Sequence, residues 1–177
     1  MLIRSEDPFF LRLNVKLDRI EVEILKGGRN LENLVAMGEV PQDELVEMRT
    51  GLIALRIHNI YNGMEQIWAD IALRIDGEKP DGEGTHAALL EQMMASSSNR
   101  PAMITPDELA AYDDLRRFRH LFRHSYGIDL RPAEVLEKFL SIRETVWPGF
   151  LGSLEKLRSH LEDEPEADEG LGPAGPN

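Results

Sequence analysis

Cysteine is absent from the 177 residues of this chain. A disulfide framework, a thiolate zinc site and a cysteine nucleophile are therefore excluded. No apolar run approaches the ~20 residues that a helix needs to cross a bilayer. The opening residues, MLIRSEDPFF, lack the basic start and apolar middle of a signal peptide. We expect a cytoplasmic protein with no membrane partner.

Basic side chains are also fewer than acidic ones. The chain has 20 Lys and Arg against 32 Asp and Glu, a formal net charge of −12. Binding along phosphate backbones needs a broad basic surface, so this balance argues against a general nucleic-acid coat. Six of the acids lie in residues 162–177, which hold no base and leave a net charge of −6 for the rest. Because residues 161–177 are poor in large apolar groups, we expect a single domain over 1–160 and a disordered acidic tail over 161–177.

Strand patterning is missing as well, since no segment alternates apolar and polar residues. Apolar residues instead recur every three or four positions, which is typical of helices with one buried face. The two clearest stripes are Phe10, Leu13, Leu17, Ile20, Ile24 and Ile53, Ile57, Ile60, Met64, Ile67, Ile71, Ile75. They predict helices that begin at Asp7-Pro8 and after Pro41. Gly27-Gly28 either breaks the first helix or lets its stripe resume through Leu31, and the pattern leaves both possibilities open.

The rest of the chain continues as helices separated by turn signals. A turn-rich loop over 76–84 ends the second helix, and a short helix follows over 85–94. Thr105-Pro106-Asp107-Glu108 forms a capping box that starts the next helix, and Gly127 is a plausible end for it. Pro132 opens a last helix that runs to about His160, with a kink expected at Pro148. The sequence therefore predicts an all-α, up-and-down bundle of four or five helices.

The helix after Thr105 carries RHLFRHSY, residues 119–126, an unusual concentration of Arg and His in an acidic chain. On a helical wheel Leu115, Phe118, Leu121 and Phe122 fall on one side. Arg116, Arg119, His120, Arg123 and His124 fall within about 140° of one another on the other side. No Asp or Glu lies between positions 116 and 124 to form i,i+4 pairs.

These residue types suit phosphodiester cleavage without a metal. The reaction needs a base for the 2′-OH, an acid for the leaving oxygen and a fixed cation for the phosphate. Histidine, with an unperturbed pKa of ~6.5, serves in either proton role, and the planar fork of arginine fits phosphate. The plainer interpretation is a solvated face, or one that acids of a neighbouring helix neutralise.

Other signatures of chemistry are lacking. The chain has no glycine-rich phosphate loop, no Gly-x-Ser-x-Gly elbow and no His and acid spacing suited to zinc, so we predict no metal and no cofactor. His58, Tyr61 and Glu65 flank the apolar stripe of the second helix. They either line the same cleft as the basic face or form the polar flank of a core helix. His86 and His160 are expected at the surface.

The motif resembles that of the HEPN superfamily, specifically the HepT-like ribonuclease toxins. Their extended motif is Arg-x4-His-x-Tyr, which this chain matches with Arg119, HLFR, His124, Ser125 and Tyr126. His120 stands where many relatives have Asn or Asp. Residues 58–93 and the segment YDDLRRFRHLFRHSYGIDL are also similar to the longer HepT-like members, so the resemblance covers roughly 8–160.

The resemblance implies a homodimer in which two motif helices meet and form a composite site for metal-independent cleavage of RNA. His124 would be the acid–base group, Arg119 would hold the phosphate and His120 would assist. Arg116 and Arg123 would bind RNA. In HepT systems the motif tyrosine, here Tyr126, is modified with AMP by a minimal nucleotidyltransferase antitoxin, which silences the toxin.

Two other functions remain open on the sequence alone. The chain is either an RNase toxin, a non-catalytic HEPN partner of a nucleotidyltransferase, or a plain helical dimerisation module. In the last case the basic face would meet acids of its own chain or of a protein partner.

Overall fold

The computed structural model describes residues 3–36, 43–82, 84–124 and 130–163, without the side chains of 34–36, 43–44 and 123–124. These residues form five helical rods, which confirms the all-α bundle. The rods are α1 (Pro8–Ala36); α2 (Asp43–Ile71) with its π-helical extension η1 (Ala72–Asp76); α3 (Thr85–Met94); α4 (Pro106–His124); and α5 (Pro132–Ser141), which runs through the π-helical turn η2 (Ile142–Val146) into α6 (Trp147–Asp163).

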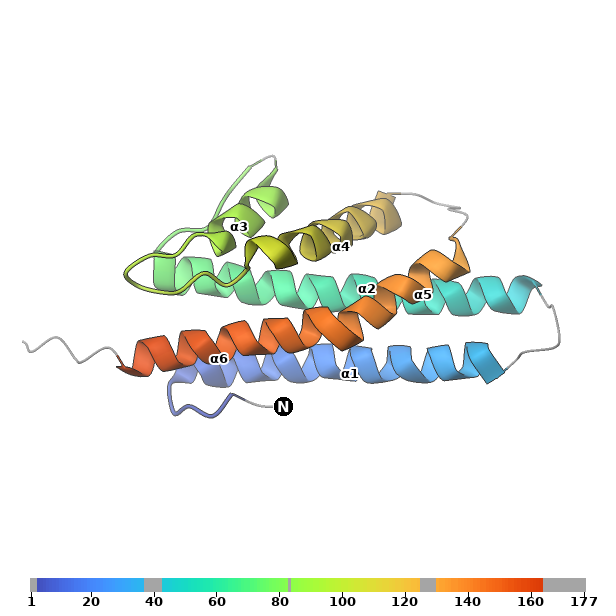
Figure 1. Cartoon of the computed structure of the whole chain (residues 1–177), viewed down its shortest axis with the longest axis horizontal. Coiled ribbons are helices and arrows are strands. Elements are labelled where there is room, and N and C mark those ends of the chain that lie inside the picture. Colours follow the sequence, from blue (N-terminus) through green and yellow to red (C-terminus); the bar gives the residue numbers. More distant parts are fainter. Residues whose placement is uncertain (1–2, 37–42, 83, 125–129, 164–177) are drawn as a thin grey trace, which may run out of the picture.

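Helix α2 lies at the centre of the bundle (Figure 1). Helix α1 and the long rod of α5 and α6 lie on one side of it, and α3 and α4 lie on the other side. Successive long helices run in opposite directions, as the colours along the chain show, so the topology is up-and-down as predicted. The predicted dimer is a separate matter and stays a prediction.

The two apolar stripes form the core. In α1 Phe10, Leu13 and Leu17 are at most 1% exposed. In α2 the stripe from Ile53 to Ile71 is completely buried, whereas Ile75, its last predicted member, is only partly buried. Burial of apolar surface at about 25 cal/mol per Å² is the main driving force for this arrangement.

Glycine sets how closely two pairs of helices approach. Helix α1 continues through Gly27-Gly28, which answers the question that the pattern left open. A Cβ added at Gly27 would lie 2.2 Å from Cε2 of Phe139 in α5. A Cβ at Gly63 of α2 would lie 2.5 Å from Cγ1 of Ile20 in α1. Both contacts are closer than van der Waals distance, so these two positions need glycine for packing.

Helix ends follow the predicted signals. The backbone N–H of Thr105 donates to Oε2 of Glu108 at 2.9 Å, which confirms the capping box at the start of α4. The last rod changes direction between α5 and α6, as predicted for a helix that contains Pro148 (Figure 1). Proline has no N–H to give to the carbonyl of Glu144, and the π-helical turn over 142–146 accommodates that missing bond.

Arg100 anchors the segment that follows α3. Its side chain is 2% exposed, and its Nε and Nη2 donate to the two carboxylate oxygens of Asp76 at 2.7 and 2.8 Å. Nη2 also donates to the carbonyl of Gln92 in α3 at 2.8 Å. Asp76 is the last residue of the α2 rod. The hydrogen bonds of the Arg100 guanidinium to Asp76 and to Gln92 therefore fix α3 against the end of that rod.

Parts of the predicted organisation fall outside the described residues. Helix α6 ends at Asp163, so only residues 161–163 of the predicted tail are described, and they are helical. The tail over 164–177 and the helix end at Gly127 remain predictions. Of the helices described, none combines the length and the apolarity that a membrane crossing requires.

Candidate functional site

Helix α4 has one face in the core, as the helical wheel predicts. Leu115 and Phe118 are buried, and the ring of Phe122 stacks on that of Phe118 with centroids 6.3 Å apart. Leu121 differs from the others on this side, because its side chain is 49% exposed. It lies at the edge of a groove between α4 and α5 rather than beneath a neighbouring helix.

Arg119 points inward from α4 against α2 and α3. Its Nε donates to Oδ1 of Asn62. Its Nη1 lies 3.3 Å from Nε2 of His86, and its Nη2 lies 3.4 Å from Oε2 of Glu65. The side chain of Arg119 is only 12% exposed. Three side chains from two other helices therefore fix the direction of this guanidinium.

These contacts continue into a wider cluster, which we call the Arg119 cluster: Arg119, His58, Asn62, Glu65 and His86. Nδ1 of His86 lies 2.6 Å from Oε1 of Glu65. Nδ2 of Asn62 lies 2.8 Å from Nε2 of His58. The ring of His58 packs against that of Phe122, with the ring centroids 5.4 Å apart. Four of the five members come from α2 and α4, which pack directly on each other.

The cluster decides between the two interpretations of the polar residues on α2. Glu65 contacts Arg119 directly, and His58 reaches the arginine through Asn62. Tyr61 does not take part, because its side chain is fully buried in the core. Tyr61 is therefore a core residue, and this burial raises the pKa of its phenol well above the ordinary value.

Two members of the cluster were not predicted. Asn62 lies four residues after His58 and three before Glu65, so it shares their helix face, and that spacing was an available signal. His86 was expected simply at the surface; its side chain is indeed 45% exposed, but both ring nitrogens have partners in the cluster. Nothing in the sequence near His86 indicates this, since the contact depends on how α3 packs on α4.

Arg116 has an acidic partner, contrary to the expectation from the sequence. Its Nε lies 2.8 Å from Oδ1 of Asp113, one turn earlier on α4, and Arg117 pairs with the same carboxylate at 2.7 Å. Burial raises the pKa of Asp113, but the hydrogen bond and the charge of Arg116 outweigh it, and the net shift is downward. The acid lies one turn before the basic face, outside positions 116–124.

His120 lies apart from Arg119. It lines a groove of about 480 Å³ between α4 and α5, together with Arg116 and Lys138. Arg119 is not among the residues that line this groove. The adjacent motif residues Arg119 and His120 therefore face different neighbours of α4. Arg123 and His124 lie in the last turn of α4, but their side chains are not described, and Tyr126 lies outside the described residues. Their predicted roles stay predictions.

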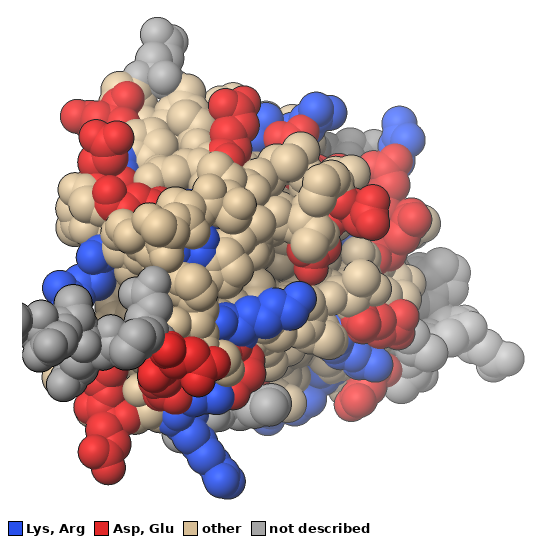
Figure 2. Space-filling view, turned by 60° about the vertical axis from the view of Figure 1, so that its left-hand side comes forward, with Lys and Arg blue, Asp and Glu red and all other residues tan. Residues whose placement is uncertain are grey.

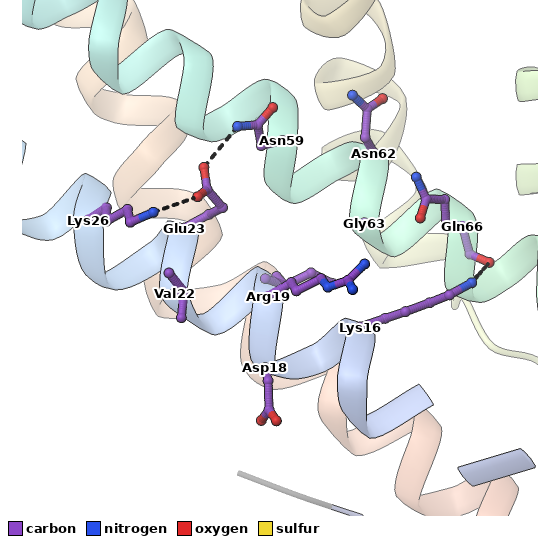
Figure 3. A pocket seen from close by; sticks show the side chains of 11 residues that line it. Lys16, Asp18, Arg19, Val22, Glu23, Lys26, Asn59, Asn62, Gly63 and Gln66 are labelled. Atoms are coloured by element: carbon purple, nitrogen blue, oxygen red, sulfur yellow. Dashed lines mark hydrogen bonds and ion pairs between the residues drawn. The ribbon is translucent and has the colours of Figure 1, made fainter. Parts of the chain in front are cut away.

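A second groove, of about 590 Å³, lies between α1 and α2 (Figure 3). Asn62 lines it, so this groove adjoins the Arg119 cluster. Its lysines are neutralised, because Lys16 pairs with Asp70 and Lys26 lies 3.5 Å from Glu23. Arg19 and Asp18 also line the groove, so acidic and basic side chains are mixed along it.

The surface charge agrees with that result. Figure 2 shows one face on which acidic and basic side chains are interspersed over a mostly uncharged surface, with a basic side chain near its middle. On that face no broad basic surface is seen, so any anion must be held by local groups. The Arg119 cluster is such a local group, with one arginine and two histidines around one carboxylate.

An all-α bundle with a motif arginine fixed against its central helix agrees with the resemblance to HEPN domains. Residues 52–161, more than half of the chain, match the sequence profile of a family described as HepT-like protein. The chain therefore belongs to the HepT-like protein family of the HEPN superfamily. The match begins in α2 and ends in α6, so it includes the whole Arg119 cluster. No curated protein and no solved structure matches the chain.

Proposed function

We propose that this protein is a metal-independent endoribonuclease, the toxin of a pair whose antitoxin is a minimal nucleotidyltransferase. The observation that carries the proposal is the guanidinium of Arg119, held by Asn62 and Glu65 within a matching Arg-x4-His-x-Tyr motif. Membership of the HepT-like family supports it, because HEPN ribonucleases are typical of that family.

In this proposal Arg119 holds the scissile phosphate. A guanidinium already oriented by neighbouring side chains loses little freedom when it binds an oxyanion, and it stabilises the charge that develops there. His124, five residues later on the same helix, transfers protons. His120 assists from the neighbouring groove, and Arg116 and Arg123 bind the RNA strand. The products are a 2′,3′-cyclic phosphate and a 5′-hydroxyl.

The active species in the proposal is a homodimer in which two motif helices meet. Two copies of Arg119 and His124 would then share one cleft, which confines RNA binding to one place on an acidic protein.

A second candidate is a helical module without catalysis. The pairs Arg116–Asp113 and Arg119–Glu65 favour it, because acids of the same chain already neutralise part of the basic face. The same pairs also suit an enzyme that keeps its arginine oriented before substrate arrives, so an activity measurement has to separate the two.

The experiment is cleavage of a mixed RNA in EDTA by the purified wild type, His124→Ala and His160→Ala, with the intact mass of each protein recorded. We expect the wild type and the His160 variant to cut and the His124 variant to be inactive. Absence of cutting by an unmodified wild type contradicts the proposal. Absence of cutting by a wild type whose mass includes AMP means that the protein was silenced, and Tyr126→Phe should then restore cleavage.

A further inference from the structure

The imidazole of His86 is held between a carboxylate and a guanidinium. Its Nδ1 lies 2.6 Å from Oε1 of Glu65, and its Nε2 lies 3.3 Å from Nη1 of Arg119. An ionised carboxylate only accepts hydrogen bonds, and a guanidinium only donates them. The two contacts therefore select one tautomer, in which Nδ1 carries the hydrogen and Nε2 presents its lone pair beside Arg119.

This arrangement has the parts of a histidine base with an orienting acid. Glu65 fixes the ring and its tautomer from the far side, as a carboxylate does in acid–base dyads generally. The side chain of His86 is 45% exposed, whereas those of Glu65 and Arg119 are 12% exposed. A substrate can therefore reach the imidazole, while Glu65 keeps the ring oriented from the other side.

The backbone that carries His86 is also anchored. His86 lies in the first turn of α3, and Arg100 ties this helix to the end of the α2 rod through Gln92 and Asp76. The backbone N–H of Met103 donates to the carbonyl of Met93 at 2.8 Å, at the other end of α3. A base on a fixed helix keeps the geometry that proton transfer needs.

We infer that His86 is the general base of the RNA cleavage proposed above, with Glu65 as its positioning residue, so the inference rests on that proposed function. A phosphate oxygen that accepts a hydrogen bond from Nη1 of Arg119 lies beside Nε2 of His86, because the two nitrogens are only 3.3 Å apart. The 2′-hydroxyl of the same nucleotide is then within reach of Nε2.

The step balances in protons and electrons. Nη1 of Arg119 turns from His86 to the phosphate, which frees the lone pair on Nε2. That nitrogen takes the 2′-OH proton while O2′ forms a bond to phosphorus and the bond from phosphorus to O5′ breaks. The leaving O5′ receives a proton from His124. The imidazolium of His86 then gives its proton to water, and His124 takes one back from water, so both histidines return to their starting states. Glu65 balances the positive charge that His86 gains.

This assignment gives the two proton transfers to different histidines. His124 in the motif serves as the acid, and His86 on α3 serves as the base. His120 does not fit the second role from its position, because it lines the groove between α4 and α5 rather than the Arg119 cluster.

The test compares wild type, His86→Ala, His86→Gln and His160→Ala on an RNA oligonucleotide, with kcat and KM measured separately. We expect kcat to fall about 100- to 1,000-fold for both His86 variants, as for loss of a general base, with KM unchanged. The amide oxygen of Gln can still accept a hydrogen bond from Arg119, but it cannot take a proton. Free imidazole should restore part of the activity of His86→Ala.

A substrate with sulfur in place of the 5′-bridging oxygen separates base from acid. A thiolate leaves without a proton, so this substrate should restore His124→Ala and leave His86→Ala slow. If His86→Gln cleaves like the wild type, or if the thio substrate restores His86→Ala, the base role is wrong. If the wild type itself does not cut RNA, the proposed function fails and the inference falls with it. Thermal unfolding checks that the exposed His86 side chain can be removed without loss of the fold.

Discussion

The guanidinium of Arg119 on α4 lies 3.4 Å from the carboxylate of Glu65 on α2, and both side chains are 12% exposed. A pair with so little solvent around it interacts more strongly than a surface ion pair. Helix packing thus joins an arginine of the HepT-like motif to an acid that the motif does not contain. The site depends on the central helix as much as on the motif.

A double-mutant cycle measures this contact. The single variants Arg119→Ala and Glu65→Ala and the double variant are unfolded in urea. We expect a coupling free energy of about 0.5–3 kcal/mol, because each residue loses its partner in a nearly buried place. Free energies of unfolding that add to within about 0.3 kcal/mol would mean that the two side chains do not interact.

Gly27 and Gly28 are adjacent in α1 but differ in how closely a neighbouring helix approaches them, so alanine substitutions at the two positions can be compared. A Cβ at Gly27 meets the ring of Phe139, whereas one at Gly28 has Nη1 of Arg143 as its nearest neighbour, at 3.9 Å. We expect Gly27→Ala to lower the free energy of unfolding by about 1–3 kcal/mol through overpacking. Gly28→Ala should raise it by about 0.5–1 kcal/mol, the usual gain for alanine in a helix. Equal effects in urea denaturation would contradict the close approach of α1 and α5.

Stability should depend on pH through Glu23 in the groove of Figure 3. Burial raises the pKa of this carboxyl, but hydrogen bonds from Asn59 and Arg56 outweigh it, so its pKa in the folded protein lies below the ordinary 4.5. The stabilisation is therefore complete above pH 4.5 and is lost as the pH falls through the lower, folded value.

The measurement is the difference in free energy of unfolding between wild type and Glu23→Gln across this acidic range. We expect the advantage of the wild type to shrink as the pH falls. Asn59→Ala removes one of the hydrogen bonds that lower the pKa, so its stability should depend less steeply on pH. A difference that is constant with pH would contradict the pairing.

Tyr126 gives a prediction about regulation. If a minimal nucleotidyltransferase is the partner, incubation with such an enzyme and ATP should add AMP to the wild type, and RNA cleavage should stop. Tyr126→Phe should keep its mass and its activity under the same conditions. AMP found on another residue, with cleavage still lost, would show that the motif tyrosine is not the target.

Much of the fold follows from local pattern. The stripe from Ile53 to Ile71, the capping box at Thr105 and the bend near Pro148 depend on residues close in sequence, and the structure confirms each of them. Continuation of α1 through Gly27 could not be predicted, because the reason for that glycine is Phe139 on a distant helix.

The site could be predicted only in part, for the same reason. Arg119 lies on the basic face that the helical wheel defines, and the position of Glu65 beside the apolar stripe of α2 is compatible with the same cleft. The wheel does not indicate that Arg119 contacts α2 and α3 while His120 lines the groove between α4 and α5. His86 reaches Arg119 through the packing of α3, a contact between three helices that no periodicity encodes.

The central claim is that Arg119 holds a phosphate during RNA cleavage. The most direct measurement is single-turnover cleavage of RNA in EDTA by wild type and Arg119→Ala, with the product ends identified by mass spectrometry. We predict 2′,3′-cyclic phosphate ends from the wild type and a rate at least about 100-fold lower for the variant, the usual cost of removing an oxyanion-stabilising group. Cleavage by Arg119→Ala at the wild-type rate, or no cleavage by an unmodified wild type, would contradict the account.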